Sequence, residues 1–182
     1  MKTLRAVLTA LVGASLLLVA LPGLAGAATT TTTFTLNGGA LNITAPGTTV
    51  NLGSASTSAG SLSAQLGTVS VTDNRGLLNG GWTSTVSSSH FTTGAGTAAE
   101  TINATNVSYW SGAATASSGL GTLLGSQLTS LLAVVINSAQ TAFTGGSLIG
   151  NNSASWNPTL VVTIPASAVV GTYTGTVTHT VA

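Results

Sequence analysis

Side chains that carry acid–base chemistry are scarce in this 182-residue chain. Its carboxylates are Asp73 and Glu100, and Lys2 and Arg5 are two of its three cations. Glycoside hydrolysis needs two carboxylates held together, and nothing in the sequence brings Asp73 and Glu100 to one place. Serine hydrolysis needs a base, an orienting acid and a nucleophile elbow, and "GGSLIG" at 145–150 misses the second glycine of Gly-x-Ser-x-Gly by one position. The sequence therefore predicts a protein that is not an enzyme.

The sequence also has few residues that could bind a metal or a cofactor. The chain has two histidines, His90 and His179, and no cysteine. A site of two histidines and a carboxylate is one interpretation of His179, and a neutral, hydrogen-bonded imidazole on the inward side of a strand is the favoured one. No Walker loop or Gly-x-Gly-x-x-Gly motif follows a strand. We expect no cofactor and no metal, and the lack of clustered cations predicts no nucleic-acid partner.

The aromatic side chains are better candidates for ligand binding than the few ionisable ones. Trp82 shares the parity of Val86 on an alternating segment, which favours the core, whereas an exposed indole would stack on the face of a sugar. Tyr109 and Trp110 are neighbours, and neighbours on a strand point to opposite faces, so one of them is expected to be exposed. Trp82, Trp110 and Tyr109 are therefore the candidate sugar-binding aromatics.

The remaining candidate is a short charged segment, Asp73-Asn74-Arg75-Gly76. It predicts a turn in which Asp73 caps its own backbone and Gly76 supplies positive φ. Arg75 has two interpretations. Its planar fork could clamp a carboxylate of a peptidoglycan peptide, or it could pair with Asp73 as a structural group, which is the favoured reading.

The elements that would position these residues have the period of β-strands. Apolar and polar residues alternate over 62–66, 69–72, 82–86, 160–164 and 172–181, with a change of parity at Gly67 that indicates a bulge or bend. Short strands separated by Gly, Asn and Pro predict an antiparallel, Greek-key-like β-sandwich. Leucines at helical spacing between 120 and 133 are the exception. There we expect a short helix or loop near 122–132 that runs into a strand near 133–137.

The first residues have the pattern of an export signal. Lys2 and Arg5 precede an apolar run over 6–21, and Ala25-Gly26-Ala27 supplies the small residues of a cleavage site. A membrane anchor is the rival interpretation, but the run is shorter than the ~20 residues that span a bilayer. We expect a cleaved signal peptide over 1–27, a Thr-rich linker over 28–33 and one domain over 34–182, with no membrane span in the mature chain and no sorting motif or tail after it.

Three segments resemble the WxL domain family of Gram-positive surface proteins. "VTDNRGLLNGGWTSTVSSSHF" (71–91) resembles its first signature region, "WNPTLVVTIPASAVVGTYTGTVTHTVA" (156–182) its C-terminal region and "NATNVSYWSG" (103–112) its middle. Both eponymous Trp-x-Leu motifs are altered, to Trp82-Thr83-Ser84 and His179-Thr180-Val181. The resemblance implies a divergent member that is exported, β-rich and attached non-covalently to the cell wall, with peptidoglycan as ligand. High Ala, Gly and Thr with little Lys would suit an actinobacterium.

Three functions follow as hypotheses. The leading one is an exported module that associates with peptidoglycan or another wall polysaccharide and is found at the cell surface, with other surface proteins as further partners. The second is a structural subunit or scaffold that assembles through strand edges, because few charges protect them. The third uses the alternate Thr residues of 172–180 to contact a regular lattice, which requires matching Thr on adjacent strands.

Overall fold

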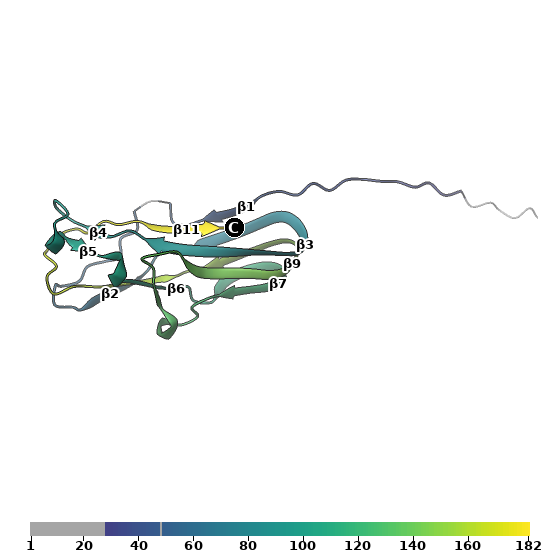
Figure 1. The fold of residues 1–182 in the computed structure, drawn as a ribbon. Helices are drawn as coiled ribbons and strands as arrows, with labels where there is room; N and C mark the ends of the chain where they lie inside the picture. The colour runs from purple at the N-terminus through teal and green to yellow at the C-terminus, as the bar shows by residue number, and fades with distance from the viewer. Residues whose placement is uncertain (1–27, 48) are drawn as a thin grey trace, which may run out of the picture. The chain divides into compact units, whose positions relative to one another are not determined.

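The computed structural model describes residues 28–47 and 49–182. Residues 28–35 are exposed and carry no helix or strand. Leu36–Ala182 forms one compact unit built from antiparallel strands (Figure 1). The predicted signal peptide lies outside the described residues. Within them, no helix is long and apolar enough to cross a membrane.

The compact unit confirms the predicted all-β, antiparallel architecture. Its strands are β1 (Leu41–Thr44), β2 (Ser61–Gln65), β3 (Val69–Ser88), β4 (Phe91–Thr92), β5 (Thr101–Ile102), β6 (Val107–Trp110), β7 (Ala114–Gly125), β8 (Val134–Val135), β9 (Gln140–Trp156), β10 (Thr159–Thr163) and β11 (Val177–Val181). Three single 3-10 turns interrupt them: η1 (Ala98–Glu100), η2 (Ala104–Asn106) and η3 (Ser130–Leu132). In the larger sheet, A, the order is β1-β3-β9-β7, with β11 beside the second half of β3, and in sheet B it is β2-β10-β6-β8.

The three long strands of sheet A fold back on themselves. Phe143 and Trp156 lie near opposite ends of the 17-residue strand β9, yet their rings stack with centroids 4.6 Å apart. A straight strand of that length would span ~50 Å. Figure 1 shows the bends of β3, β9 and β7 side by side at one end of the unit.

Residues of positive φ make these bends. β3 turns at Gly76 and Asn79, β9 at Ser147 and Gly150, and β7 at Gly119 and Gly121. Glycine reaches such φ values without steric cost. The bends expose a row of aliphatic residues paired across the three strands, Leu78, Ile149 and Leu120.

Each bent strand contributes one arm to each of two layers. Layer 1 holds the first arm of β3 with β1, the second arm of β9 and the first arm of β7. Sheet B extends this layer, because β2, β10 and β6 join β3, β9 and β7 directly and keep the same order. Layer 2 holds β11 and the other three arms. The two layers of the sandwich are thus the two halves of one bent sheet, and the inward side chains of both halves pack between them.

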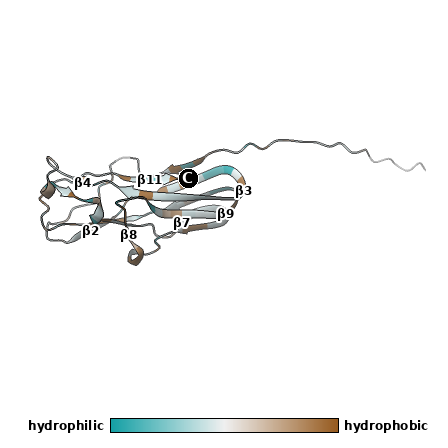
Figure 2. Ribbon diagram, in the orientation of Figure 1, coloured by the Kyte–Doolittle hydropathy of each residue, from teal (hydrophilic) through white to brown (hydrophobic). Residues whose placement is uncertain are grey.

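Two apolar clusters fill the space between the layers. Inside the bends lie Val69, Val71, Trp82, Phe143, Leu148, Ala154 and Trp156. Between sheet B and layer 2 lie Leu66, Val86, Phe91, Ile102, Val107, Tyr109, Ile136, Ala142, Leu160 and Val162. Most of the ribbon has intermediate hydropathy in Figure 2, as a chain with 3% charged residues requires. Folding therefore rests on these clusters and on backbone pairing rather than on ion pairs.

Three local predictions need correction. The leucine-rich segment begins as strand β7, which runs to Gly125, and only η3 near its end is helical, whereas the strand predicted near 133–137 is present as β8. The predicted strand over 172–181 is reduced to β11, and the residues before it join the fold through a bridge from Thr174 to Thr92. The predicted turn at 73–76 does not separate two strands, because β3 continues through it and bends. The predicted change of parity at Gly67 is confirmed, but the structure has an interruption between β2 and β3 there rather than a bulge within one strand.

Candidate functional site

A buried polar chain joins four side chains across β3 and β9. Trp82 Nε1 donates to Asn152 Oδ1 at 2.9 Å, and Asn152 Nδ2 donates to Asp73 Oδ2 at 3.2 Å. Arg75 donates to Asp73 through Nε at 2.8 Å and through Nη2 at 3.0 Å. Trp82, Asn152 and Asp73 are all buried. The chain therefore ties the indole in the core to the guanidinium at the surface.

Further hydrogen bonds surround the pair of Arg75 and Asp73. The guanidinium also donates to the carbonyl oxygen of Gly81 at 2.9 Å, and the backbone N–H of Arg75 donates to Asp73 Oδ1 at 3.0 Å. The Arg75 side chain lowers the pKa of Asp73 to about 2, while the carboxylate raises the pKa of Arg75. The sequence-based role of Asp73 as a backbone cap is confirmed. Arg75 is paired with Asp73, which agrees with the favoured structural interpretation, and the clamp interpretation stays a prediction.

A second network surrounds Tyr109, whose hydroxyl is fully buried. Trp156 Nε1 donates to Tyr109 Oη at 2.9 Å, and His179 Nε2 lies 3.2 Å from the same oxygen. Tyr109 Oη already accepts a hydrogen bond from the Trp156 indole, so the hydroxyl proton of Tyr109 needs an acceptor of its own. His179 Nε2 is the acceptor within reach. His179 is then the neutral tautomer with its proton on Nδ1, and burial lowers its pKa to about 4. The favoured reading of His179 therefore agrees with the geometry.

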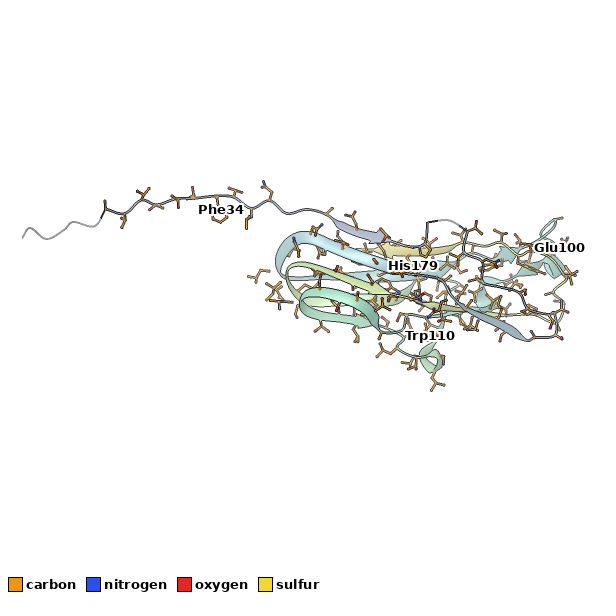
Figure 3. All side chains as sticks on the ribbon, turned by 180° about the vertical axis from the view of Figure 1, so that it is seen from behind. Phe34, Glu100, Trp110 and His179 are labelled. Atoms are coloured by element: carbon orange, nitrogen blue, oxygen red, sulfur yellow. The ribbon has the colours of Figure 1, made fainter. Side chains whose placement is uncertain are left out.

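The candidate aromatics do not converge on one patch. Trp82 and Tyr109 are core residues, whereas Trp110 is half-buried and points away from the core on β6. Trp110 is paired in register with Thr159 on β10, which is paired with Gln65 on β2. Figure 3 labels Trp110 and His179. The expectation that Tyr109 and Trp110 have opposite orientations is confirmed, and of these three aromatics only Trp110 remains accessible.

The outward side of layer 1 in sheet A, here the Ser face, carries hydroxyl and amide groups in register. One row crosses Asn42, Thr72, Ser153 and Ser118 on four strands, and the next crosses Thr44, Ser70 and Ser155. Hydrogen bonds fix several of these groups, including Ser70 to Ser155 at 2.7 Å and Ser118 to Ser153 at 2.8 Å. Trp110 lies on the outward side of the same layer, in sheet B.

The outward side of layer 2, here the Thr face, is a second hydroxyl surface. Thr180 of β11, Thr85 of β3 and Thr141 of β9 form one row, and Thr178 is paired with Ser87 in the next. Thr85 and Thr180 share a hydrogen bond of 2.7 Å. The matching Thr on adjacent strands, which the lattice hypothesis required, is therefore present.

No catalytic or metal-binding constellation is found among residues 28–47 and 49–182. Within that part of the chain no three His, Cys, Asp or Glu side chains gather as a metal site would need. Glu100 accepts hydrogen bonds from the backbone and side chain of Thr97 and so serves as the capping residue of η1. Asp73 and Glu100 therefore hold separate structural roles.

Sequence reasoning missed Asn152 and the Ser face. The signal was present in "NNSASW" at 151–156, where Asn152, Ala154 and Trp156 share one parity and Ser153 and Ser155 share the other. Comparison with protein-family models, with curated proteins and with solved structures finds no match. The resemblance to the WxL family therefore stays a prediction.

Proposed function

We propose that this chain is an exported, non-enzymatic module that adheres to uncharged polysaccharide of the cell envelope through the Ser face and Trp110. The observation that carries the proposal is the row of hydroxyl and amide groups that runs in register over β1, β3, β9 and β7. Such groups offer donors and acceptors to sugar hydroxyls, and they do so without charge. Binding of this kind is insensitive to salt, because no ions are displaced.

Pre-organisation favours this surface as a binding face. The Ser hydroxyls are held by each other and by the rigid sheet, so they lose little freedom when a ligand arrives. Trp110 adds the apolar surface that the Ser face lacks, and aromatic rings stack on the C–H side of sugars. Each contact is weak, but a repeating glycan presents many copies of its unit, and avidity raises the total affinity. The sheet is twisted, which favours a flexible polymer over a flat crystal as the partner.

Co-sedimentation with purified cell walls tests the proposal. We expect the protein to sediment with walls at both low and high salt, and two substitutions to release it. Trp110→Ala removes the accessible ring, and Ser153→Arg places a long cation at the centre of the Ser face. Failure of the native protein to sediment with walls at either salt concentration would count against wall binding.

A matched control exists on the same strand. Thr144 lies on β9 as Ser153 does, but it is on the outward side of the other layer and its hydroxyl bonds to Leu124 O. Thr144→Arg should leave wall binding unchanged. If Thr144→Arg releases the protein and Ser153→Arg does not, the Thr face is the binding surface and the assignment made here is wrong.

The sequence-based alternative, self-assembly, is favoured by one observation. β7 is the outer strand of sheet A, has 12 residues with no charge and no proline, and is exposed over most of its length. Such an edge is a template for a strand of a second copy. Its irregular pairing around Gly119 and Gly121 opposes long regular addition. Light scattering decides: a monomer whose mass does not change with concentration removes this alternative.

A further inference from the structure

A large, partly open cavity lies against sheet B, away from both hydroxyl faces. It has a volume of about 1140 Å³ and lies between β2 and β10 of sheet B on one side and the segment 168–177 with His179 on the other. Residues of the connection between β1 and β2, over 45–47 and 49–57, contribute to its lining. Small-molecule pockets usually measure ~300–1,000 Å³. The space is thus large enough for an elongated molecule.

The inner wall of the cavity is apolar. It is formed by side chains of the second core cluster and its neighbours: Leu62, Leu66, Phe91, Ile102, Leu160 and Val162. None of the residues that line it carries a charge. A wall of this kind binds hydrocarbon, because apolar surface leaves water on both partners.

His179 gives this wall a hydrogen-bond donor. Its Nε2 accepts the proton of the Tyr109 hydroxyl, so Nδ1 carries the ring proton. Among the described residues, the hydrogen bond of His179 is the one at Nε2, and nothing accepts a hydrogen bond from Nδ1. Tyr173, an aromatic residue of the lining, already donates to the carbonyl oxygen of Val169 at 2.9 Å. The Nδ1–H group of His179 therefore has capacity left for a ligand.

From these three features we infer that the cavity binds a neutral single-chain acyl ester, with the chain along the apolar wall and the carbonyl oxygen accepting from His179 Nδ1. Volume and apolar lining select a hydrocarbon chain. The remaining lining is neutral and includes Asn51 and several Ser and Thr side chains, and the Nδ1–H group of His179 beside the apolar wall selects an acceptor oxygen on that chain. A free carboxylate is disfavoured, because the wall offers no cation to offset the loss of its hydration.

Fluorescence titration with the methyl ester of cis-parinaric acid tests the inference, with the free acid at pH 8 as the competing probe. We expect saturable binding of one ester per chain and weaker binding of the carboxylate. His179→Phe keeps a ring of similar size but removes the donor, and it should weaken ester binding about five- to tenfold, the value of one neutral hydrogen bond.

The apolar wall is tested by a pair of substitutions on β2. Leu62 points inward and lines the cavity, whereas its neighbour Ser63 points outward and does not. Leu62→Trp should weaken ester binding, because the larger ring covers part of the apolar wall along which the chain lies, and Ser63→Trp should leave binding intact. The inference is overturned if the native protein shows no saturable ester binding, or if the two variants bind equally.

A measurement on the native protein covers the case in which Leu62→Trp does not fold. Nuclear Overhauser contacts between the methylene protons of the bound ester and the ring protons of Phe91 are expected, since Phe91 lines the cavity. Contacts only to residues outside the cavity would refute the assignment. Polysaccharide binding does not enter any of these readouts, so either proposal can fail while the other stands.

Discussion

Replacing Arg75 by methionine should destabilise the fold at neutral pH and much less in acid. The change removes both guanidinium bonds to Asp73 and the bond to Gly81 O, but it keeps most of the aliphatic stem. Asp73 is only 2% exposed, so its carboxylate would remain buried with the backbone N–H of Arg75 and Asn152 as donors. An ion left in that position loses its principal stabilising partner.

The pKa of Asp73 sets the size of this effect. The fall from 3.8 to about 2 corresponds to about 2.4 kcal/mol, at ~1.4 kcal/mol for each pH unit. The largest cause is the Arg75 side chain, so Arg75→Met should cost about 2 kcal/mol at pH 7, or about 4–8 °C in Tm. The folded-state pKa lies below the unfolded one. This stabilisation is therefore present above pH 3.8 and is lost as the pH falls towards 2.

Urea unfolding at pH 7 and near pH 2.5 measures the prediction. The difference between native protein and Arg75→Met should be largest at pH 7 and shrink in acid. The double variant Asp73→Asn/Arg75→Met is the control, because it removes the unpaired charge and should recover stability relative to Arg75→Met alone. A cost below about 0.5 kcal/mol at pH 7, the size of an ordinary surface substitution, or an equal cost at both pH values would show that Arg75 does not stabilise the buried carboxylate.

Three further predictions use other buried groups. His179 has a folded-state pKa of about 4 against 6.5 in the unfolded chain, so the free energy of unfolding should fall by about 3 kcal/mol as the pH drops from 6.5 towards 4. Urea unfolding of His179→Phe should show a much smaller change of this free energy over the same pH range. Gly145→Ala should cost about 1–3 kcal/mol in thermal unfolding, because its Cβ would lie 2.7 Å from Trp82 Nε1; no loss of Tm would contradict the tight approach. Ser84 Oγ is buried with no partner among the described residues, so Ser84→Ala should raise stability by about 1 kcal/mol, and a lower Tm would mean that a partner is present.

Strand parity was the most reliable guide to this fold. The alternation over 172–181 predicts that Tyr173, Val177 and His179 face inward and that the intervening Thr residues face water, and the structure agrees even where the segment is not a regular strand. The same rule separates Tyr109 from Trp110. It works because side chains alternate along any extended backbone, whether or not it is paired.

Bends and long-range pairing were beyond the sequence. "NRGLLNGG" at 74–81 has the composition of a turn between two strands, yet β3 keeps its pairing with β9 on both sides of the bend. Nothing local identifies β9 as that partner. The leucines over 120–132 have helical spacing by coincidence, because β7 is an outer strand and much of its surface is exposed. Gly119 and Gly121 are the residues at which β7 turns.

The position of β11 has a consequence for the order of events during synthesis. The arm of β3 that ends at Ser88 pairs on one side with β11, Val177–Val181, and the backbone groups of Thr83 and Ala182 hydrogen-bond to each other. All of β4 to β10 lies between these two partners in the chain. During synthesis this arm of β3 therefore stays unpaired on one side until β11 has been made, and closing so long a connection is the slow step of non-local β-topologies.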